Sequence, residues 1–213
     1  MRHRNRVLIL KLITLLISAA LAWTTTASAP LAAERRVKLP PGFRINVFAS
    51  ELEGPRFMAF DKRGRLFVRL PRAGRVVVLP DTNGDGRADR AVVFASGLNN
   101  PHGIAMRGEY VYVAEEGRVV RFADRDGDLS GDALEVVVPE LPPGGGHWTH
   151  TIGFGPRGKM YVSIGSSCNA CLEEDQRRAA IMLFDADGKN GRLFARGLRN
   201  PVGFVWDRRS GDM

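Results

Sequence analysis

Four short apolar segments of similar form recur along this chain, and this internal repeat constrains the fold more than any other feature. The segments occupy residues 55–60, 101–106, 149–154 and 201–206, so their last residues are 46, 48 and 52 positions apart. Three of them are followed by a polar turn containing Gly and then by a second apolar strand. Third and fourth apolar strands follow at 74–79 and 90–94, and again at 117–122 and 134–138.

Four short strands per unit, separated by turns rich in Gly, Pro and Asp, are typical of a β-propeller blade. A β-sandwich or an open meander is the alternative, but neither has this registered repetition. The pattern predicts an all-β domain over residues 34–213, with about three blades plus the first strand of a fourth. Because propeller rings close with roughly four to eight blades, we expect a fragment or a chain that depends on a partner.

Residues 1–33 have the layout of a secretory signal peptide. A basic start with Arg2, Arg4 and Arg6 precedes an apolar run over 7–23, and small residues follow. An uncleaved membrane anchor is the alternative, although a run of about 17 residues is at the low end for spanning a bilayer. We therefore expect removal of the signal and a periplasmic or secreted protein.

The charges of the chain do not point to a nucleic-acid partner. The formal net charge is +8, and without the four basic residues of the predicted signal 27 basic residues face 23 acidic ones. These charges are interspersed along the sequence, whereas nucleic-acid binding calls for a basic stripe with interleaved aromatic residues. A solvated surface is the simpler interpretation.

The only two cysteines, Cys168 and Cys171, form a Cys-x-x-Cys pair. Leu172 follows them, so the His that covalent haem attachment requires is absent, and no second pair completes a zinc site. In an exported protein this spacing favours a local structural disulfide, with redox catalysis as the alternative.

Asp81, Asn83, Asp85 and Asp89 place an oxygen ligand at nearly every second position of one polar loop. This spacing predicts a structural Ca²⁺ site, although the glutamate of an EF-hand is missing and strands flank the loop. The alternative is a plain hairpin turn, since Asn-Gly and Asp-Gly are strong turn formers. The loop 124–132 repeats the theme less completely in the next unit.

Two motifs carry the residues best suited to chemistry. His147 follows three glycines and enters an innermost strand, where it can act as a general base or simply line the channel. Arg199 and Asn200 enter the next innermost strand, and Arg199 stands where the parallel segment 97–101, two repeats earlier, has Asn. His102 and His150 lie on related strands, where each can either pack in the core or support the residues of the site.

These motifs resemble a known family. Gly146-His147 followed by 154–165 is similar to the catalytic segment of soluble PQQ-dependent aldose (glucose) dehydrogenases, and 198–203 resembles their cofactor-facing Arg-Asn-Pro segment. The glycine-rich approach to His147 and the cysteine pair resemble the L-sorbosone dehydrogenase-like branch more closely. The resemblance covers nearly all of the mature chain and implies the N-terminal half of a six-bladed propeller.

The resemblance also implies roles for the site residues. His147 would take the proton of a sugar hydroxyl, while the carbon gives its hydride to PQQ. Arg199 would stabilise charge on the quinone oxygen, Asn200 would hold the cofactor, and Ca²⁺ would complete the site. The expected partners are an aldose or related sugar and a soluble electron acceptor. Two features depart from the family: its carboxylate-gripping residues come from later blades, and Gly146 precedes His147 where a polar group is usual.

Two other functions remain open at this point. A Ca²⁺-dependent lactonase-type propeller hydrolase would need metal ligands in the channel, and Glu115 and Glu116 are the plausible start of such a set. A non-catalytic propeller used as a binding platform would make His147 and Arg199 incidental. The sequence leaves the oligomeric state open, with a homodimer among the alternatives.

Overall fold

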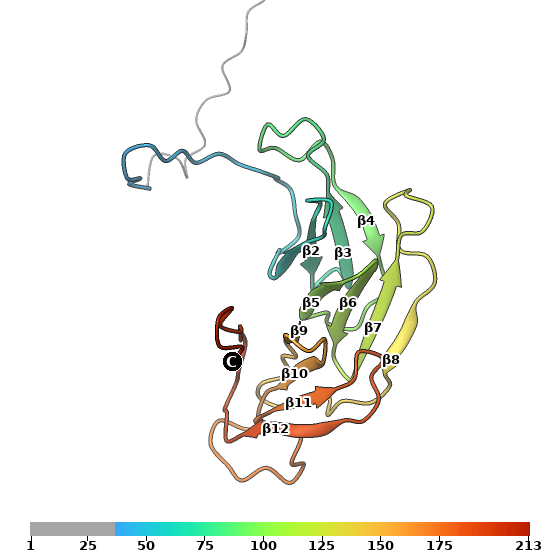
Figure 1. Cartoon of the computed structure of the whole chain (residues 1–213), viewed down its shortest axis with the longest axis vertical. Helices are drawn as coiled ribbons and strands as arrows, with labels where there is room; N and C mark the ends of the chain where they lie inside the picture. Colours follow the sequence, from blue (N-terminus) through green and yellow to red (C-terminus); the bar gives the residue numbers. More distant parts are fainter. Residues whose placement is uncertain (1–36) are drawn as a thin grey trace, which may run out of the picture. The chain divides into compact units, whose positions relative to one another are not determined.

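The computed structural model describes residues 37–213, so the predicted signal peptide 1–33 lies outside the described residues (Figure 1). The chain divides into two units, Met1–Ile45 and Asn46–Met213, and all the strands found within residues 37–213 belong to the second unit. Across 37–213 we find no helix that has the length and apolarity to cross a membrane.

The second unit contains three four-stranded antiparallel sheets, each formed by consecutive strands of the chain (Figure 1). Blade 1 consists of β1 (Met58–Phe60), β2 (Leu66–Leu70), β3 (Arg75–Leu79) and β4 (Val92–Ala95). Blade 2 consists of β5 (Gly103–Arg107), β6 (Tyr110–Glu115), β7 (Arg118–Ala123) and β8 (Glu135–Val138). Blade 3 consists of β9 (Ile152–Phe154), β10 (Met160–Ile164), β11 (Ala180–Phe184) and β12 (Arg192–Arg196). The predicted all-β propeller architecture is confirmed.

The three blades share an irregularity as well as a strand order. In each blade the pairing of the third strand with the fourth shifts register, at Val76/Val77, Val119/Val120 and Ile181/Met182. A bulge bends the strand and increases its right-handed twist. The outermost strand of each blade therefore turns away from the plane of the other three at the same point.

Apolar clusters between successive blades form the core. Phe67 of blade 1, Phe94 of blade 1 and Phe122 of blade 2 stack edge to face, with ring centroids 4.9 and 6.1 Å apart. A second cluster joins blades 2 and 3 around Val119 and Val162. Because side chains pack on both faces of each sheet, middle strands such as β2, β10 and β11 are buried along their whole length.

The innermost strands β1, β5 and β9 lie side by side. Gly103 of β5 makes this approach possible, because a Cβ at that position would lie 2.6 Å from the carbonyl oxygen of His150. The segments that enter β5 and β9 carry His102 and His147, and Arg199 lies in the segment that follows β12. The packing of the blades therefore sets the spacing of the candidate site.

The segment Pro201–Trp206, expected to open a fourth blade, forms no strand in the structure. Thr151 anchors it, because the Thr151 hydroxyl donates to the carbonyl of Val202 at 2.9 Å. Phe204 and Trp206 pack against the face of blade 3 that is turned away from blade 2. A strand is defined by a hydrogen-bonded neighbour, and side-chain packing alone does not form a ladder. These residues cover apolar surface that the third blade would otherwise expose.

Candidate functional site

The loop that follows β10, residues 165–171, touches both of the predicted catalytic side chains. Ser166 and Asn169 of this loop bind His147 and Arg199, respectively. The sequence motifs are more than 50 residues apart from end to end, and this loop brings them to one place. We call it the 165–171 loop.

Ser166 determines which nitrogen of His147 carries the proton. The Nδ1 atom of His147 lies 2.7 Å from Ser166 Oγ, and that hydroxyl donates to the carbonyl of Cys168 at 2.6 Å. A serine hydroxyl has a single proton, so its oxygen must accept from His147 Nδ1–H. The Nε2 atom then carries the free lone pair. His147 is thus held as the tautomer that accepts a proton at Nε2.

The backbone of His147 is held as closely as its ring. Its N–H donates to the carbonyl of Ser166 at 3.0 Å, and a Cβ on Gly165 would come within 2.2 Å of the His147 carbonyl oxygen. Arg178 donates to the carbonyl groups of Pro143 and Gly144, which fixes the glycine-rich approach. The small residues noted in the sequence are therefore needed for close contact between the two segments.

Arg199 is exposed, and the Asn169 side chain and carbonyl hold its guanidinium. Arg199 Nε donates to Asn169 O at 3.0 Å and to Asn169 Oδ1 at 3.1 Å. Asn169 lies between Cys168 and Cys171, which form a disulfide. The disulfide closes the short loop that orients Asn169, and through Asn169 it positions Arg199.

Asn200 lies beside the segment that contains His147. Its Oδ1 atom accepts a hydrogen bond from Thr149 Oγ1 at 2.7 Å, so its amide nitrogen is the group left to donate. The carbonyl of Arg199 accepts from Ser166 N–H at 2.9 Å. His147, Arg199 and Asn200 are therefore connected through one hydrogen-bonded network.

Sequence reasoning missed Ser166, Asn169 and Thr149, which position the three predicted residues. Each is a small polar residue next to a feature already singled out: the cysteine pair or His147. Adjacency to those motifs was the available signal. It could not show which side chain would reach which partner across 19 to 51 positions of chain.

His102 and His150 are packing residues. Only 3% of His102 and 1% of His150 is exposed, and His102 Nδ1 donates to the His150 carbonyl at 3.1 Å. Burial lowers the pKa of each ring to about 4, and the charge of Arg69 adds to this effect at His102. Both rings are neutral at pH 7, so neither is poised for proton transfer there.

These two histidines predict a loss of stability in mild acid. Their folded-state pKa lies near 4, against an ordinary 6.5, so between these values the unfolded chain binds protons that the folded chain does not. The free energy of unfolding should be constant above pH 6.5 and fall as the pH drops toward 4, by on the order of 3 kcal/mol for each ring. Urea unfolding at several pH values measures this slope.

A His102→Gln variant serves as the control for that slope, because Gln keeps a donor for the His150 carbonyl and does not titrate. The fall between pH 6.5 and 4 should shrink by about half in this variant. An unchanged slope would assign the acid sensitivity to other groups. Hydrogen bonds lower the pKa of Asp89 and the pKa of Asp185 below the ordinary value of an aspartate, so both carboxyl groups titrate below this pH window.

The predicted calcium loop binds its own backbone. Asp81 accepts three loop N–H groups at 2.9 to 3.2 Å, and Asp89 accepts from the N–H and hydroxyl of Thr82. Asn83 donates to Asp85 at 3.1 Å. These bonds favour the hairpin-turn interpretation of the loop. A Ca²⁺ ion bound by Asp81, Asn83, Asp85 and Asp89 stays a prediction.

Within the described part of the chain, acidic side chains converge closely in the second loop instead, at Asp124, Asp126 and Asp128. The other group with metal-binding potential contains Cys168 and Cys171, whose sulfur atoms are joined in the disulfide and offer no thiolate. From the sequence, we expected the loop that contains Asp81 to be the better metal site and the loop 124–132 to be the weaker one.

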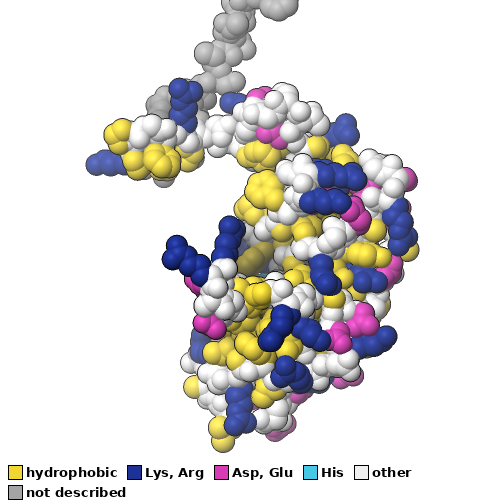
Figure 2. Space-filling view, in the orientation of Figure 1, with side chains coloured by type: hydrophobic (Ala, Val, Ile, Leu, Met, Phe, Trp, Pro, Cys, Tyr) yellow, Lys and Arg dark blue, Asp and Glu magenta, His cyan; other side chains and the backbone are white. Residues whose placement is uncertain are grey.

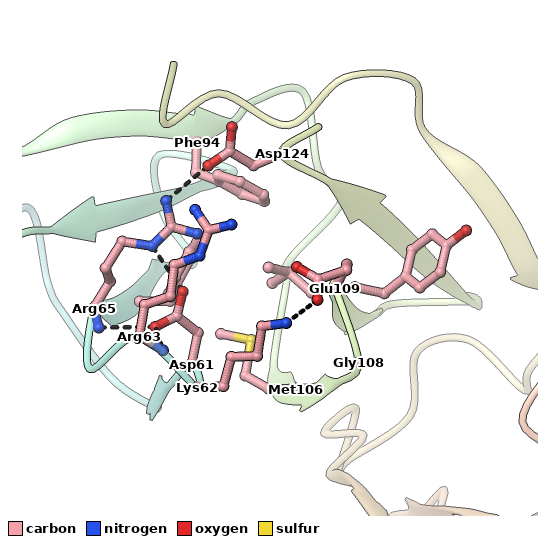
Figure 3. Close-up of a pocket in the computed structure, with 12 residues that line it drawn as sticks. Asp61, Lys62, Arg63, Arg65, Phe94, Met106, Gly108, Glu109 and Asp124 are labelled. Carbon is pink, nitrogen blue, oxygen red and sulfur yellow. Dashed lines mark hydrogen bonds and ion pairs between the residues drawn. The ribbon is translucent and has the colours of Figure 1, made fainter. Parts of the chain in front are cut away.

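An ionic seam joins the turn between β1 and β2 of blade 1 to the turn between β5 and β6 and to the end of β7 in blade 2 (Figure 3). Lys62 pairs with Glu109, and Arg65 pairs with Asp61 and with Asp124, both at 2.7 Å. The space between these side chains is about 20 Å³, too small for anything larger than a water molecule. This seam is structural. Over the rest of the visible surface, basic and acidic side chains are interspersed (Figure 2).

Glu115 and Glu116 are already engaged within the protein. The Glu115 side chain is fully buried, accepts from Asn99 N–H at 2.6 Å and pairs with Arg118. Glu116 accepts from Asn100 Nδ2 at 2.8 Å. Both carboxylates are therefore already engaged by donors of the protein.

The chain is similar to one family of sequences and to several solved structures. The sequence model of a family described as a domain of unknown function, DUF7133, matches residues 29–208. No curated protein matches the chain. Among solved structures, the PQQ domain of pyranose dehydrogenase from Coprinopsis cinerea in its holo form gives a TM-score of 0.69 at 22% identity, over 80% of this chain and 45% of that one.

Two further structures have the same fold. A carbohydrate-active enzyme of family AA12 from Trichoderma reesei, in a calcium structure, gives a TM-score of 0.62 at 24% identity over 73% of this chain and 44% of its own. The PQQ-bound aldose sugar dehydrogenase of Streptomyces coelicolor gives 0.59 at 22% identity over 73% of this chain and 54% of its own. The chain spans about half the length of these structures. It belongs to the DUF7133 family and has the β-propeller fold of the soluble PQQ-dependent sugar dehydrogenases.

Proposed function

We propose that this chain carries the base-and-arginine part of a PQQ-dependent sugar dehydrogenase site. The observation that carries the proposal is the tautomer of His147, whose Nε2 lone pair is left free by the hydrogen bond from Nδ1 to Ser166. Arg199, held through Asn169, shares the 165–171 loop with it. A base and a fixed cation held by one loop are suited to removing a proton and stabilising the negative charge that develops.

The residues fit the cofactor in their chemistry. PQQ, when bound, supplies the hydride acceptor. His147 Nε2 would take the proton of the sugar hydroxyl, and the exposed guanidinium of Arg199 would face the quinone oxygen. The amide nitrogen of Asn200 would donate to the cofactor, since its oxygen already accepts from Thr149. Ca²⁺ is expected with the cofactor. The substrate is an aldose or a related sugar such as L-sorbosone, and a soluble acceptor removes the electrons.

The expected location is the periplasm or the exterior of the cell, because residues 1–33 have the signal layout. Cell fractionation checks it. A protein found in the periplasm or medium and shortened at its N-terminus supports export, whereas retention in the inner membrane at full length supports the anchor.

Reconstitution tests the proposed activity. The purified protein is loaded with PQQ and Ca²⁺, and dye reduction is followed with glucose, other aldoses and L-sorbosone. We expect PQQ-dependent reduction with at least one of these sugars. Hydrolysis of lactones without dye reduction would favour the hydrolase, and saturable sugar binding without either reaction would favour a binding protein. Either result would overturn the dehydrogenase proposal.

A further inference from the structure

A pocket of about 450 Å³ opens beside the candidate site and is rich in arginine. Its lining includes Arg56, Arg69, Arg72, His102, Trp148 and Thr149. These side chains come from the start of β1, the end of β2 and the segments that enter β5 and β9. The pocket is therefore formed where three blades meet on the inner side.

Arg69 is the residue of this pocket whose surroundings are most unusual for a charged side chain. It is 1% exposed, and its guanidinium donates to the carbonyl of Pro101 at 2.5 Å and lies 5.0 Å from the ring of Phe57. Its Nε atom is buried without a hydrogen-bond partner. A buried cation normally has a carboxylate beside it, because removing its charge from water is costly.

No carboxylate compensates this charge in the described part of the chain. None of the ion pairs formed within 37–213 includes Arg56, Arg69 or Arg72. Burial lowers the pKa of Arg69 to about 10, and repulsion from the nearby positive charge of Arg56 adds to this effect. The neighbouring His102 is neutral. Three cations thus line one pocket, and none of the described residues forms the ion pair that would offset their repulsion.

The pocket is continuous in sequence with the candidate base. Trp148 and Thr149 directly follow His147, and Thr149 donates to Asn200. An aromatic ring together with a few polar groups is the common lining of a small-molecule site. A molecule held over Trp148 would therefore reach from the arginines toward the 165–171 loop.

We propose that this pocket binds the carboxylate of an acidic sugar, of the hexuronate class. The exposed guanidinium groups of Arg56 and Arg72 form charge-assisted hydrogen bonds with the carboxylate, and Arg69 adds its charge from the pocket floor. The ring of the sugar lies against Trp148. As an assignment of substrate class, this proposal rests on the proposed dehydrogenase function. As the assignment of a binding site for an acidic sugar, it does not depend on that function.

Isothermal titration calorimetry with the purified chain, in the absence of PQQ, tests the pocket. The probes are D-glucuronate, D-galacturonate, D-glucose and acetate. We expect saturable binding of a hexuronate at least about tenfold tighter than binding of glucose or acetate, because only the acidic sugar uses both the arginines and Trp148. Binding should weaken as the salt concentration rises.

Matched variants locate the binding. Arg56→Gln combined with Arg72→Gln should weaken hexuronate affinity by about tenfold or more, since both groups lose their charge. Arg75→Gln is the control, because Arg75 is an exposed arginine of the same blade outside the pocket lining, and it should change nothing. Both arginines of the double variant are exposed, so the fold should survive their replacement.

Three outcomes would overturn the inference: no hexuronate binding, equal affinity for glucuronate and glucose, or equal losses in the double variant and in Arg75→Gln. Competition between PQQ and hexuronate would assign the pocket to the cofactor and would also overturn it. Hexuronate binding with no dye reduction after reconstitution would refute the proposed function and leave the carboxylate pocket standing.

Discussion

Replacing His147 with Asn should reduce kcat of the reconstituted protein by about a thousandfold, while PQQ affinity changes by less than about threefold. The reason is specific to Nε2: Asn can keep a donor near Ser166 but has no basic nitrogen at the position where the hydroxyl proton goes. Steady-state dye reduction gives kcat, and titration with PQQ followed by its absorbance gives the affinity.

Ser166→Ala is the informative companion to that variant. It removes the acceptor that holds the proton on Nδ1, so a fraction of His147 adopts the other tautomer and kcat should fall by about tenfold, less than in His147→Asn. A loss of PQQ binding in His147→Asn that equals the loss of turnover would show that His147 is structural. Equal activity of His147→Asn and the unchanged protein would remove it from the mechanism.

Replacing Gly188 with Ala should lower the free energy of unfolding by about 3 kcal/mol, the largest loss of stability that we expect from adding one methyl group. Gly188 has φ of +83°, and a Cβ there would lie 1.9 Å from the carbonyl oxygen of Val137. That carbonyl belongs to β8 of blade 2, whereas Gly188 lies in the turn between β11 and β12 of blade 3. The clash therefore separates two blades at their contact. Urea unfolding followed by circular dichroism measures the change.

Gly197→Ala separates the clash from the cost of the backbone conformation. Gly197 has a nearly equal φ of +79°, but a Cβ there meets nothing within 4 Å. Its replacement should cost about 1 kcal/mol, which is the penalty for a left-handed conformation alone. Similar losses in the two variants would mean that blades 2 and 3 adjust freely around Gly188, contrary to the packing described above.

The order of strands could be predicted because it is a local property of this sequence. Each strand is a short apolar run bounded by Gly, Pro or Asp, as at 74–79, and neighbouring strands pair across turns of a few residues. A single apolar run could be assigned to more than one kind of structure, and its repetition along the chain identifies it as a strand of a blade. The segment 201–206 has the same local form yet makes no ladder, because pairing requires a partner strand that local form does not provide.

The calcium loop shows a second limit of local patterns. Asp81 and Asp89 have the spacing of metal ligands, and the same spacing lets a carboxylate accept from the N–H groups of its own turn, as both do here. A Ca²⁺ ion bound by this loop stays a prediction. The sequence pattern is identical for the two uses. Only the positions of the oxygen atoms distinguish them.

By itself, the sequence determined the all-β propeller repeat, the cysteine pair and the selection of His147, Arg199 and Asn200 as the residues to examine. These follow from residue type and from spacing along the chain. The tertiary structure alone decided that Ser166 leaves Nε2 of His147 free, that Asn169 holds Arg199, and that Arg69 lies buried without a carboxylate partner among residues 37–213. The physical reason is that hydrogen bonds and charge compensation depend on distances of about 3 Å between side chains from different blades, and no spacing along the chain encodes those distances.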